Sequence, residues 1–515
     1  MKWNEGQKHA ISSIAEGKNV NIRAVAGSGK STTLAESVKR FVEKNNSSAA
    51  VLMFNVDAAS AMRGKLAGVP GCKVSTLNAY SYAEMIRRYP FIRDSLKGFI
   101  DSGYFIRKYD ISDYTTRSSH ITFSQEHIAL LLREWISEFC KRPDEHFGTG
   151  NFPVKVFSEI VVGAKYSDTE LQSIARDLYN HVKPIALLHW NSMWNGEVDS
   201  MMHDAYLKKW FLEGGKISQD ACFVDEYQDS NGLGESIYER SSTLSVVGDV
   251  FQEIYEFRGT GGRSNRIKFD EYVDMNQSYR FGPYVAEMST LIIQEWLGSD
   301  MKVIGHPGKT SSPMSYDTKL SDFDAIICRS RAGVLECAIQ LAKSGEPLRA
   351  DGVSFSNMSR LVMNISALQE KKKYDRSTFP AGVNSYYDLI SAYNSGGIQR
   401  TSDLGAALSL YDKSGKDSSM YVLNRLKNME QSGGTLITTT HKSKGLEFSK
   451  VRVHNDYNAP FKIDSNGLVK KTPKWREEEG RLAYVAVSRA IDGLATPDNF
   501  PTKMDSIRAD KEPCF

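Results

Sequence analysis

The chain has 515 residues, of which 41% are hydrophobic and 25% are charged, and its formal net charge is +3. These values are typical of a globular protein, and the length exceeds what one hydrophobic core supports, so we expect roughly three or four domains. The small net charge excludes binding of a polyanion through a global field, so any such site must come from local clustering.

Cysteine spacing and hydropathy indicate the cellular compartment of the protein. Six cysteines lie far apart and form no CxxC pair, which argues against a disulfide framework and a zinc site. No apolar run approaches the roughly 18 residues of a membrane span, and the polar start MKWNEGQKHA lacks the apolar core of a signal peptide. We expect no membrane partner and a cytoplasmic location in a bacterium or phage-infected cell, or a nuclear one in a eukaryote.

Short apolar strands alternate with helices along the chain. The predicted strands are residues 20–25, 50–54, 221–226, 244–249, 324–330, 435–441 and 450–456. Residues 31–42 predict a helix, because Leu34, Val38, Phe41 and Val42 would fall on one face. This alternation predicts an α/β fold with parallel sheets.

Two stretches interrupt the alternation and look like insertions in two α/β cores. Residues 86–200 are mainly helical by pattern, and residues 346–430 are polar and rich in Ser, Gly and Lys. We therefore predict a first core from 1–85 with 201–285, and a second core from 286–345 with 431–515.

The stretch AVAGSGKST, residues 24–32, follows a strand and opens a helix, which is the setting of a phosphate-binding loop. Glycines let the backbone N–H groups turn toward a polyphosphate, Lys30 would reach the β and γ oxygens, and Ser31 would bind Mg²⁺. Ala24 stands where the strict pattern has Gly, and the alternative is a structural strand-to-helix turn. The expected nucleotide-binding residues of the loop are Ala26, Gly27, Ser28, Gly29, Lys30, Ser31 and Thr32.

A pair of acids follows the predicted strand in ACFVDEYQDS. Asp225 is predicted to hold Mg²⁺ and Glu226 to orient and deprotonate the attacking water. Alone, two acids after a strand would more often be a solvated edge. With the loop earlier in the chain they predict a nucleoside triphosphatase that uses ATP and Mg²⁺.

The stretch VVGDVFQEIYEFRG comes about 20 residues later and ends another strand. Gln252 would lie beside the Mg²⁺ site and sense the γ-phosphate, while Phe257 and Arg258 would face a second ligand. An aromatic side chain can stack on a nucleobase without regard to base identity, as a motor on a strand requires. The alternative for Phe257 is a core aromatic.

Further motifs follow in order: QSYRFGP at 277–283, TTTHKSKGLEF at 438–448 and EEEGRLAYVAVSRA at 477–490. With the loop and the acid pair, the set resembles superfamily 1 helicases of the UvrD/Rep type. MHDAYLKKW at 202–210 and QSYRFGP resemble the F-box DNA helicase branch most, and we expect a motor without an F-box. The resemblance implies two RecA-like motor domains, each with an inserted subdomain.

The resemblance also implies roles for individual residues around ATP. Gln7 would recognise adenine and Tyr279 would stack on it. Arg280 and Arg489 would be arginine fingers that reach the γ-phosphate from the second core. Gly445 and Glu447 would contact the ribose and phosphate side of the nucleotide.

The positions that the resemblance assigns to DNA are Phe54, Asn55, Thr76, Tyr80, Phe257, Arg258 and His441. For His441 the alternative is a hydrogen-bonded structural histidine. Two runs at 87–97 and 104–110 interleave basic and aromatic residues, which suits either phosphate contacts or solvated helix faces.

These features predict a monomeric, ATP-dependent translocase and helicase on single-stranded DNA and single-strand/duplex junctions, and the resemblance implies 3′ to 5′ movement. One alternative is a translocase that strips proteins such as a recombinase or single-strand-binding protein from DNA. Another is a P-loop phosphotransferase, which has no reason to carry the motifs at 438–490. RNA stays open as a track.

Overall fold

The computed structural model describes residues 2–98, 100–161, 166–254, 267–395, 398, 402–429, 433–457, 461–463, 469–471 and 475–497. Within these residues two six-stranded sheets form, and every strand pair in both sheets is parallel. Helical regions interrupt each sheet in sequence, which confirms the predicted fold class.

The first sheet has the strand order β3-β2-β6-β7-β1-β8. Its strands are β1 (Val20–Ala24), β2 (Ala49–Met53), β3 (Cys72–Thr76), β6 (Ala221–Val224), β7 (Thr243–Gly248) and β8 (Glu271–Met275). The central strands β2 and β6 are buried throughout, as strands covered on both faces should be.

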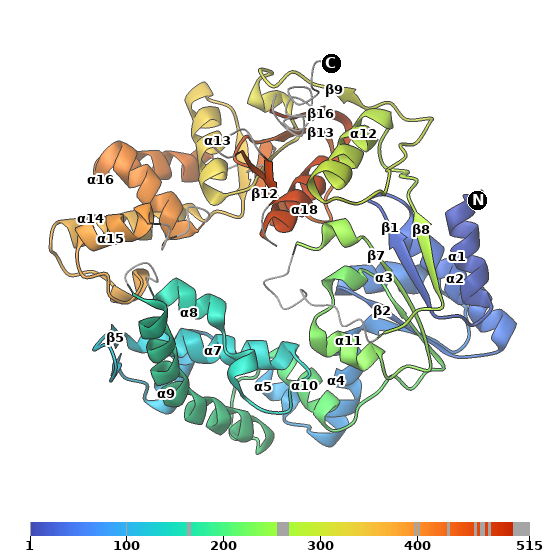
Figure 1. Ribbon diagram of the computed structural model, residues 1–515, viewed down its shortest axis with the longest axis horizontal. Helices are drawn as coiled ribbons and strands as arrows, with labels where there is room; N and C mark the ends of the chain where they lie inside the picture. The colour runs from blue at the N-terminus through green and yellow to red at the C-terminus, as the bar shows by residue number, and fades with distance from the viewer. Residues whose placement is uncertain are drawn as a thin grey trace.

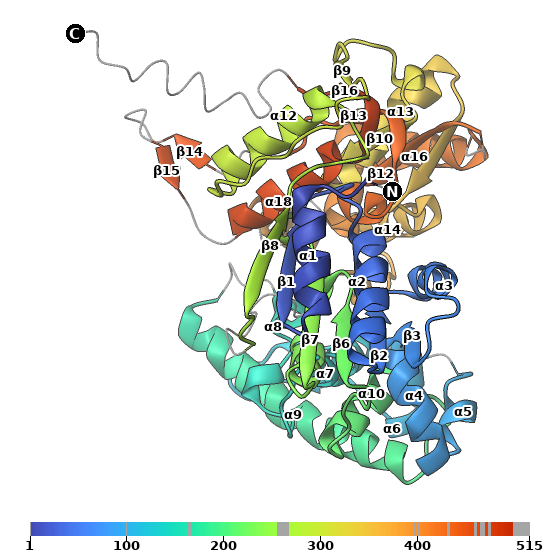
Figure 2. The ribbon, with the colours of Figure 1, turned by 90° about the vertical axis from the view of Figure 1, so that its right-hand side faces the viewer.

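Helices α1 (Glu5–Ala15), α2 (Lys30–Asn45), α3 (Val56–Lys65), α4 (Leu77–Arg88), α10 (His203–Leu212) and α11 (Gly232–Tyr238) surround this sheet. Figure 2 shows α1 and α2 side by side over one face of the strands. The predicted apolar face of α2 is confirmed, because all four of its residues are buried. Short 3₁₀ turns η3 (Tyr227–Asp229) and η4 (Val250–Gln252) follow β6 and β7.

The region between α4 and α10 is helical, with one small hairpin. Its elements are α5 (Ile92–Ser95), α6 (Ser102–Tyr109), β4 (Tyr114–Thr115), β5 (Thr122–Phe123), α7 (Gln125–Lys141), α8 (Val154–Ile160) and α9 (Asp168–Trp194). Its aromatic core is continuous with the underside of the first sheet, since Trp135 and Phe139 share a cluster with Val224 and Val246.

The second sheet has the order β11-β12-β10-β13-β16-β9. Its strands are β9 (Ser312–Pro313), β10 (Ala325–Cys328), β11 (Leu348–Asp351), β12 (Thr435–Thr439), β13 (Phe448–Val453) and β16 (Ala490–Ala495). Helices α12 (Pro283–Leu291), α13 (Arg331–Ser344), α17 (Thr440–Ser443) and α18 (Trp475–Val487) accompany it, and β14 (Phe461–Ile463) pairs with β15 (Val469–Lys471) as a separate hairpin.

The second interruption consists of α14 (Phe355–Gln369), α15 (Tyr386–Asn394) and α16 (Asp403–Met429), which bends at Gly415. The strand β11 lies inside the range predicted for this insertion, but it pairs with β12 in the core sheet. Figure 1 shows these helices beside the second sheet, on the side away from the N-terminus.

The two cores meet through one hydrophobic cluster. Val25, Ala26 and Phe251 of the first core pack with Tyr484 and other residues of α18. The end of the first sheet that carries the phosphate loop therefore faces a helix of the second core, and ligands of parallel sheets bind at such strand ends.

Candidate nucleotide site and nucleic-acid groove

The loop between β1 and α2 has the geometry of a phosphate-binding loop. Gly27 and Gly29 have φ values of +73° and +81°, which favour glycine. A Cβ on Gly27 would lie 2.5 Å from the Cβ of Arg280, so a larger residue would collide there. The loop is thus pressed between the helix it opens and the segment that follows β8.

Two buried polar atoms beside the loop indicate that the site fits an anion. Ser28 is 1% exposed, and its Oγ has no hydrogen-bond partner among the described residues. The Nε of Arg280 is likewise buried without a partner in the same part of the chain. Phosphate oxygens would satisfy such donors.

Gln7 and Tyr279, predicted to bind adenine, lie together at the edge of the loop. Gln7 donates from Nε2 to the Ser28 carbonyl at 3.3 Å, and the Tyr279 hydroxyl donates to Gln7 Oε1 at 3.4 Å. The Tyr279 backbone N–H donates to the Gly27 carbonyl at 2.7 Å. Tyr279 is 36% exposed, so part of its ring is open to stack on a base.

Asp225 follows β6 and reaches the first turn of α2. The Ser31 hydroxyl donates to Asp225 Oδ2 at 3.0 Å. Burial, helped by the charge of Glu226, raises the pKa of Asp225 to about 6. A hydroxyl and a carboxylate are the hard oxygen ligands that Mg²⁺ uses together with substrate phosphates, so this pair fits the ion. Among the described residues there is no group of three or more His, Cys, Asp or Glu side chains placed to hold a metal.

Glu226 has a left-handed backbone, with φ of +51°, which costs a non-glycine residue on the order of 1–3 kcal/mol. Gln228 holds its carboxylate from Nε2 at 2.5 Å. Burial raises the pKa of Glu226, but the charges of Lys30, Lys444 and Arg489 and the Gln228 bond outweigh it and leave that pKa below its usual value. The side chain is therefore held ionised, as a base requires.

Gln252 and Arg489 connect the two cores. Gln252 donates to Asp249 Oδ2 at 2.7 Å, and Arg489 Nη2 donates to Gln252 Oε1 at 3.1 Å. Arg489 is 1% exposed, and burial, followed by the charge of Arg280, lowers its pKa to about 9. The arginine predicted from the last motif thus bonds the glutamine predicted from the strand end.

Arg280 lies on the segment that joins β8 to α12, beside the loop rather than within the second sheet. Its Nη1 donates to the Ser488 carbonyl at 2.9 Å, and its Nη2 lies 2.6 Å from Glu447 Oε1. Gly445, two residues before Glu447, has a φ of +87°. Thr32 accepts a hydrogen bond from Lys65 at 3.2 Å.

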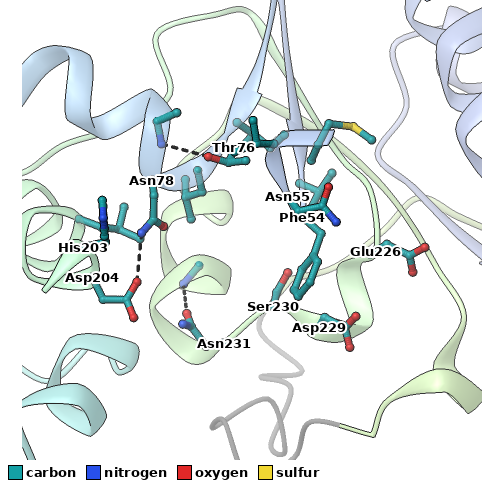
Figure 3. Close-up of a pocket in the computed structure, with 18 of the residues that line it drawn as sticks. Phe54, Asn55, Thr76, Asn78, His203, Asp204, Glu226, Asp229, Ser230 and Asn231 are labelled. Carbon is teal, nitrogen blue, oxygen red and sulfur yellow. Dashed lines mark hydrogen bonds between the residues drawn. The ribbon is translucent and has the colours of Figure 1, made fainter. Parts of the chain in front are cut away.

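A pocket of about 770 Å³ opens next to the acid pair and runs toward the first helical region (Figure 3). Phe54, Asn55 and Thr76 line it together with Asp225 and Glu226. Asn55 and Thr76 cap α3 and α4 by accepting bonds from backbone N–H groups, while Phe54 is 46% exposed and points into the pocket. The structure therefore brings three predicted DNA positions to one groove.

Tyr80 is a correction to the sequence prediction. It is 4% exposed, its hydroxyl donates to Gln219 Oε1 at 2.8 Å, and its ring carries the Lys73 amine 3.8 Å from its centroid. Tyr80 therefore packs in the core, and Tyr82 lines the groove in its place. Residues two apart on a helix point to different faces.

His441 bonds across the cores, because its Nε2 lies 3.1 Å from the Ile254 carbonyl. Burial, followed by the charge of Arg329, lowers its pKa to about 4, so the ring is neutral. This geometry agrees with the structural alternative for His441. Phe257 and Arg258 lie outside the described residues.

Three residues that the sequence did not single out complete the interface: Asp249, Lys444 and Tyr484. Lys444 donates to both oxygens of Asp229, at 2.7 and 2.6 Å, and to the Gln252 carbonyl at 2.8 Å. Lys444 and Tyr484 stand in the quoted motifs, and Asp249 precedes Gln252 by three residues. Their position in or beside these motifs was the signal in the sequence by which they could have been found.

A phosphate loop on one parallel-sheet core, faced by basic side chains of a second such core, defines a P-loop nucleoside triphosphatase with a shared site. Family models agree over most of the length: the UvrD/REP helicase N-terminal domain matches residues 3–269, and the UvrD-like helicase C-terminal domain matches residues 347–496. The chain belongs to the UvrD/REP helicase family.

Two curated proteins are similar. F-box DNA helicase 1 of Gallus gallus is 23% identical over 530 aligned residues, which cover 94% of this chain and 48% of that protein. F-box DNA helicase protein 1 of Schizosaccharomyces pombe is 25% identical over 60% of this chain and 37% of that protein. The chain thus spans about half or less of the length of these relatives. No helix among the described residues is both long and apolar enough to cross a bilayer.

Proposed function

We propose that the protein is an ATP-dependent motor that moves 3′ to 5′ along single-stranded DNA and unwinds duplex at single-strand/duplex junctions. Family membership and the two DNA helicase relatives support this activity. The direction follows from the resemblance of the motifs and from no contact in the structure.

The observation that carries the proposal is the hydrogen bond from Arg489 to Gln252, 3.1 Å across the two cores. A side chain that reaches the glutamine of the other core can stabilise transferring phosphoryl charge only while the cores are closed. Hydrolysis and core movement are then coupled, and this is the basis of stepping.

The chemistry assigns one task to each group. Lys30 binds the β and γ oxygens, and Mg²⁺, held by Ser31 and Asp225, would offset their negative charge. Glu226 takes the proton of the attacking water, since its carboxylate is held ionised. Gln7 and Tyr279 bind the base.

The track is the groove with Phe54, Asn55 and Thr76 on its wall. An exposed ring can stack on a base while the polar caps meet phosphate or sugar. The division into cores at 1–85 with 201–285 and 286–345 with 431–515 stays a proposal, and so do a monomeric state and DNA-bound protein partners.

The test measures the ATP hydrolysis rate with single-stranded DNA, RNA, duplex DNA and no polymer. We expect single-stranded DNA to stimulate hydrolysis, and equal rates in all four arms would refute the motor. Duplexes with a 3′ or a 5′ tail then test direction, and only the 3′-tailed duplex should unwind. Removal of bound recombinase without unwinding would favour the protein-stripping alternative.

A further inference from the structure

One hydroxyl joins the second core to the phosphate loop of the first. Tyr484 of α18 is fully buried, at 0% exposure. Its hydroxyl accepts a hydrogen bond from the Ala26 backbone N–H at 3.0 Å and donates one to Asp249 Oδ2 at 3.1 Å. Ala26 belongs to the loop, and Asp249 directly follows β7.

Asp249 in turn binds Gln252, the next residue of the network. The same Oδ2 atom accepts the bond from Gln252 at 2.7 Å, and Oδ1 accepts from the Phe251 N–H at 3.1 Å. The other end of the Gln252 amide, Oε1, accepts a hydrogen bond from Arg489. A continuous series of hydrogen bonds therefore runs from the loop through Tyr484, Asp249 and Gln252 to Arg489.

We propose that Tyr484 is a positioning residue that sets the Gln252 amide against the γ-phosphate and ties that setting to the phosphate loop. The proposal rests on the proposed hydrolysis of ATP and on the γ-phosphate contact that the sequence predicts for Gln252. A fixed carboxylate orients an amide, and Asp249 is fixed from two sides, by Tyr484 and by the Phe251 N–H. Buried bonds in one network are stronger together than apart, so losing one disturbs the next.

The geometry separates this role from simple packing. The Tyr484 ring lies against Phe251 edge to face, with centroids 5.8 Å apart, and Tyr484→Phe keeps that contact. It removes only the hydroxyl, leaving the Ala26 N–H without its partner and Asp249 with one donor fewer.

The experiment compares wild type with Tyr484→Phe, Gln252→Ala and the double variant, by ATP hydrolysis kinetics with and without single-stranded DNA and by ADP affinity. Tyr484→Phe should lower kcat about tenfold and leave ADP affinity within about twofold, because ADP has no γ-phosphate for Gln252 to meet. In the Gln252→Ala background the same change should cost almost nothing.

Tyr411→Phe is the matched control. It deletes another buried hydroxyl, which donates to Gln369 in the second helical region, away from the cores' interface. This control should lose thermal stability and keep its kcat, so a lower kcat in Tyr484→Phe reports more than the loss of a tyrosine hydroxyl.

An unchanged kcat, a parallel loss of ADP affinity, or full additivity in the double variant would overturn the role of Tyr484. The effects of the variants on kcat are also measured without DNA. A wild type without DNA stimulation would therefore count against the proposed function while the Tyr484 comparison still decides the inference.

Discussion

The Lys444–Asp229 pair gives the sharpest prediction, because it spans the cores and is almost dry. The side chains are 11% and 2% exposed, and the shortest N–O distance is 2.6 Å. Burial raises the pKa of Asp229 to about 6, although Lys444 acts to lower it. Lys444→Met removes the cation and leaves the acid in place.

The size of the loss follows from that pKa. Since the pKa of Asp229 is about 6, pH 8 lies two units above it. Protonating Asp229 in the wild type at pH 8 therefore costs about 2.7 kcal/mol of free energy, at about 1.36 kcal/mol per pH unit. The Lys444→Met variant can protonate Asp229, and a neutral acid needs no cation. The free energy that the variant loses with the ion pair at pH 8 is therefore at most about this value, which corresponds to about a 100-fold loss of kcat/KM. At pH 6 the protonated and ionised forms of Asp229 are equal in energy, and this upper limit falls to about twofold.

The assay is kcat/KM for DNA-stimulated ATP hydrolysis at pH 6, 7 and 8, for wild type and Lys444→Met. The deficit of the variant should grow as pH rises through the pKa of Asp229, on top of the losses from the bond to the Gln252 carbonyl and from the Lys444 charge near Glu226. Lys442→Met is the control, since Lys442 is 61% exposed and lies 3.8 Å from Asp351. A deficit that is equal at all pH values, or larger at pH 6, would refute the reasoning.

Three other substitutions test the site. Glu226→Gln should lower single-turnover hydrolysis by roughly 10² to 10⁴ and keep ATP and DNA binding, since the loop and Asp225 remain; retained turnover would reject Glu226 as the base. Arg489→Lys should lower kcat by about 10³ with ADP affinity unchanged, because a lysine cannot reproduce the planar fork, and an unchanged kcat would reject the arginine finger. Phe54→Ala should weaken single-stranded DNA binding by about 1–3 kcal/mol, measured by fluorescence anisotropy, with the DNA-free hydrolysis rate as control; unchanged affinity would remove Phe54 from the track.

The seven strands that the sequence predicted all lie inside the two sheets, away from their edges. The four edge strands β3, β8, β9 and β11 were missed, and so was the interior strand β16. β3 buries only Ser75 and β8 buries only Val273 and Met275, and polar positions at an edge discourage pairing with another chain. Apolar runs therefore predict most of the interior of a parallel sheet and miss its edges.

Within the site, local chemistry was readable and long-range pairing was not. The loop and the acid pair follow strands and need only their own neighbours to be recognised. Lys444 and Asp229 are 215 residues apart, and nothing in either segment predicts that they meet. The error at Tyr80 has another origin, because a motif position does not fix which face of α4 reaches the groove.

The proposed DNA groove and the proposed metal site are joined by a short path through the first sheet. Strands β2 and β6 pair in parallel, with Leu52 opposite Val224, so Phe54 and Asp225 emerge at the same edge of the sheet. The Asp225 N–H donates to the Leu52 carbonyl at 3.0 Å, two residues before the groove aromatic. A base stacked on Phe54, as we propose, would therefore act on a backbone that is hydrogen-bonded to the backbone of Asp225, the proposed metal ligand. Stimulation of hydrolysis by DNA would then require no long relay, because the two proposed ligand sites lie at adjacent strand ends of one sheet.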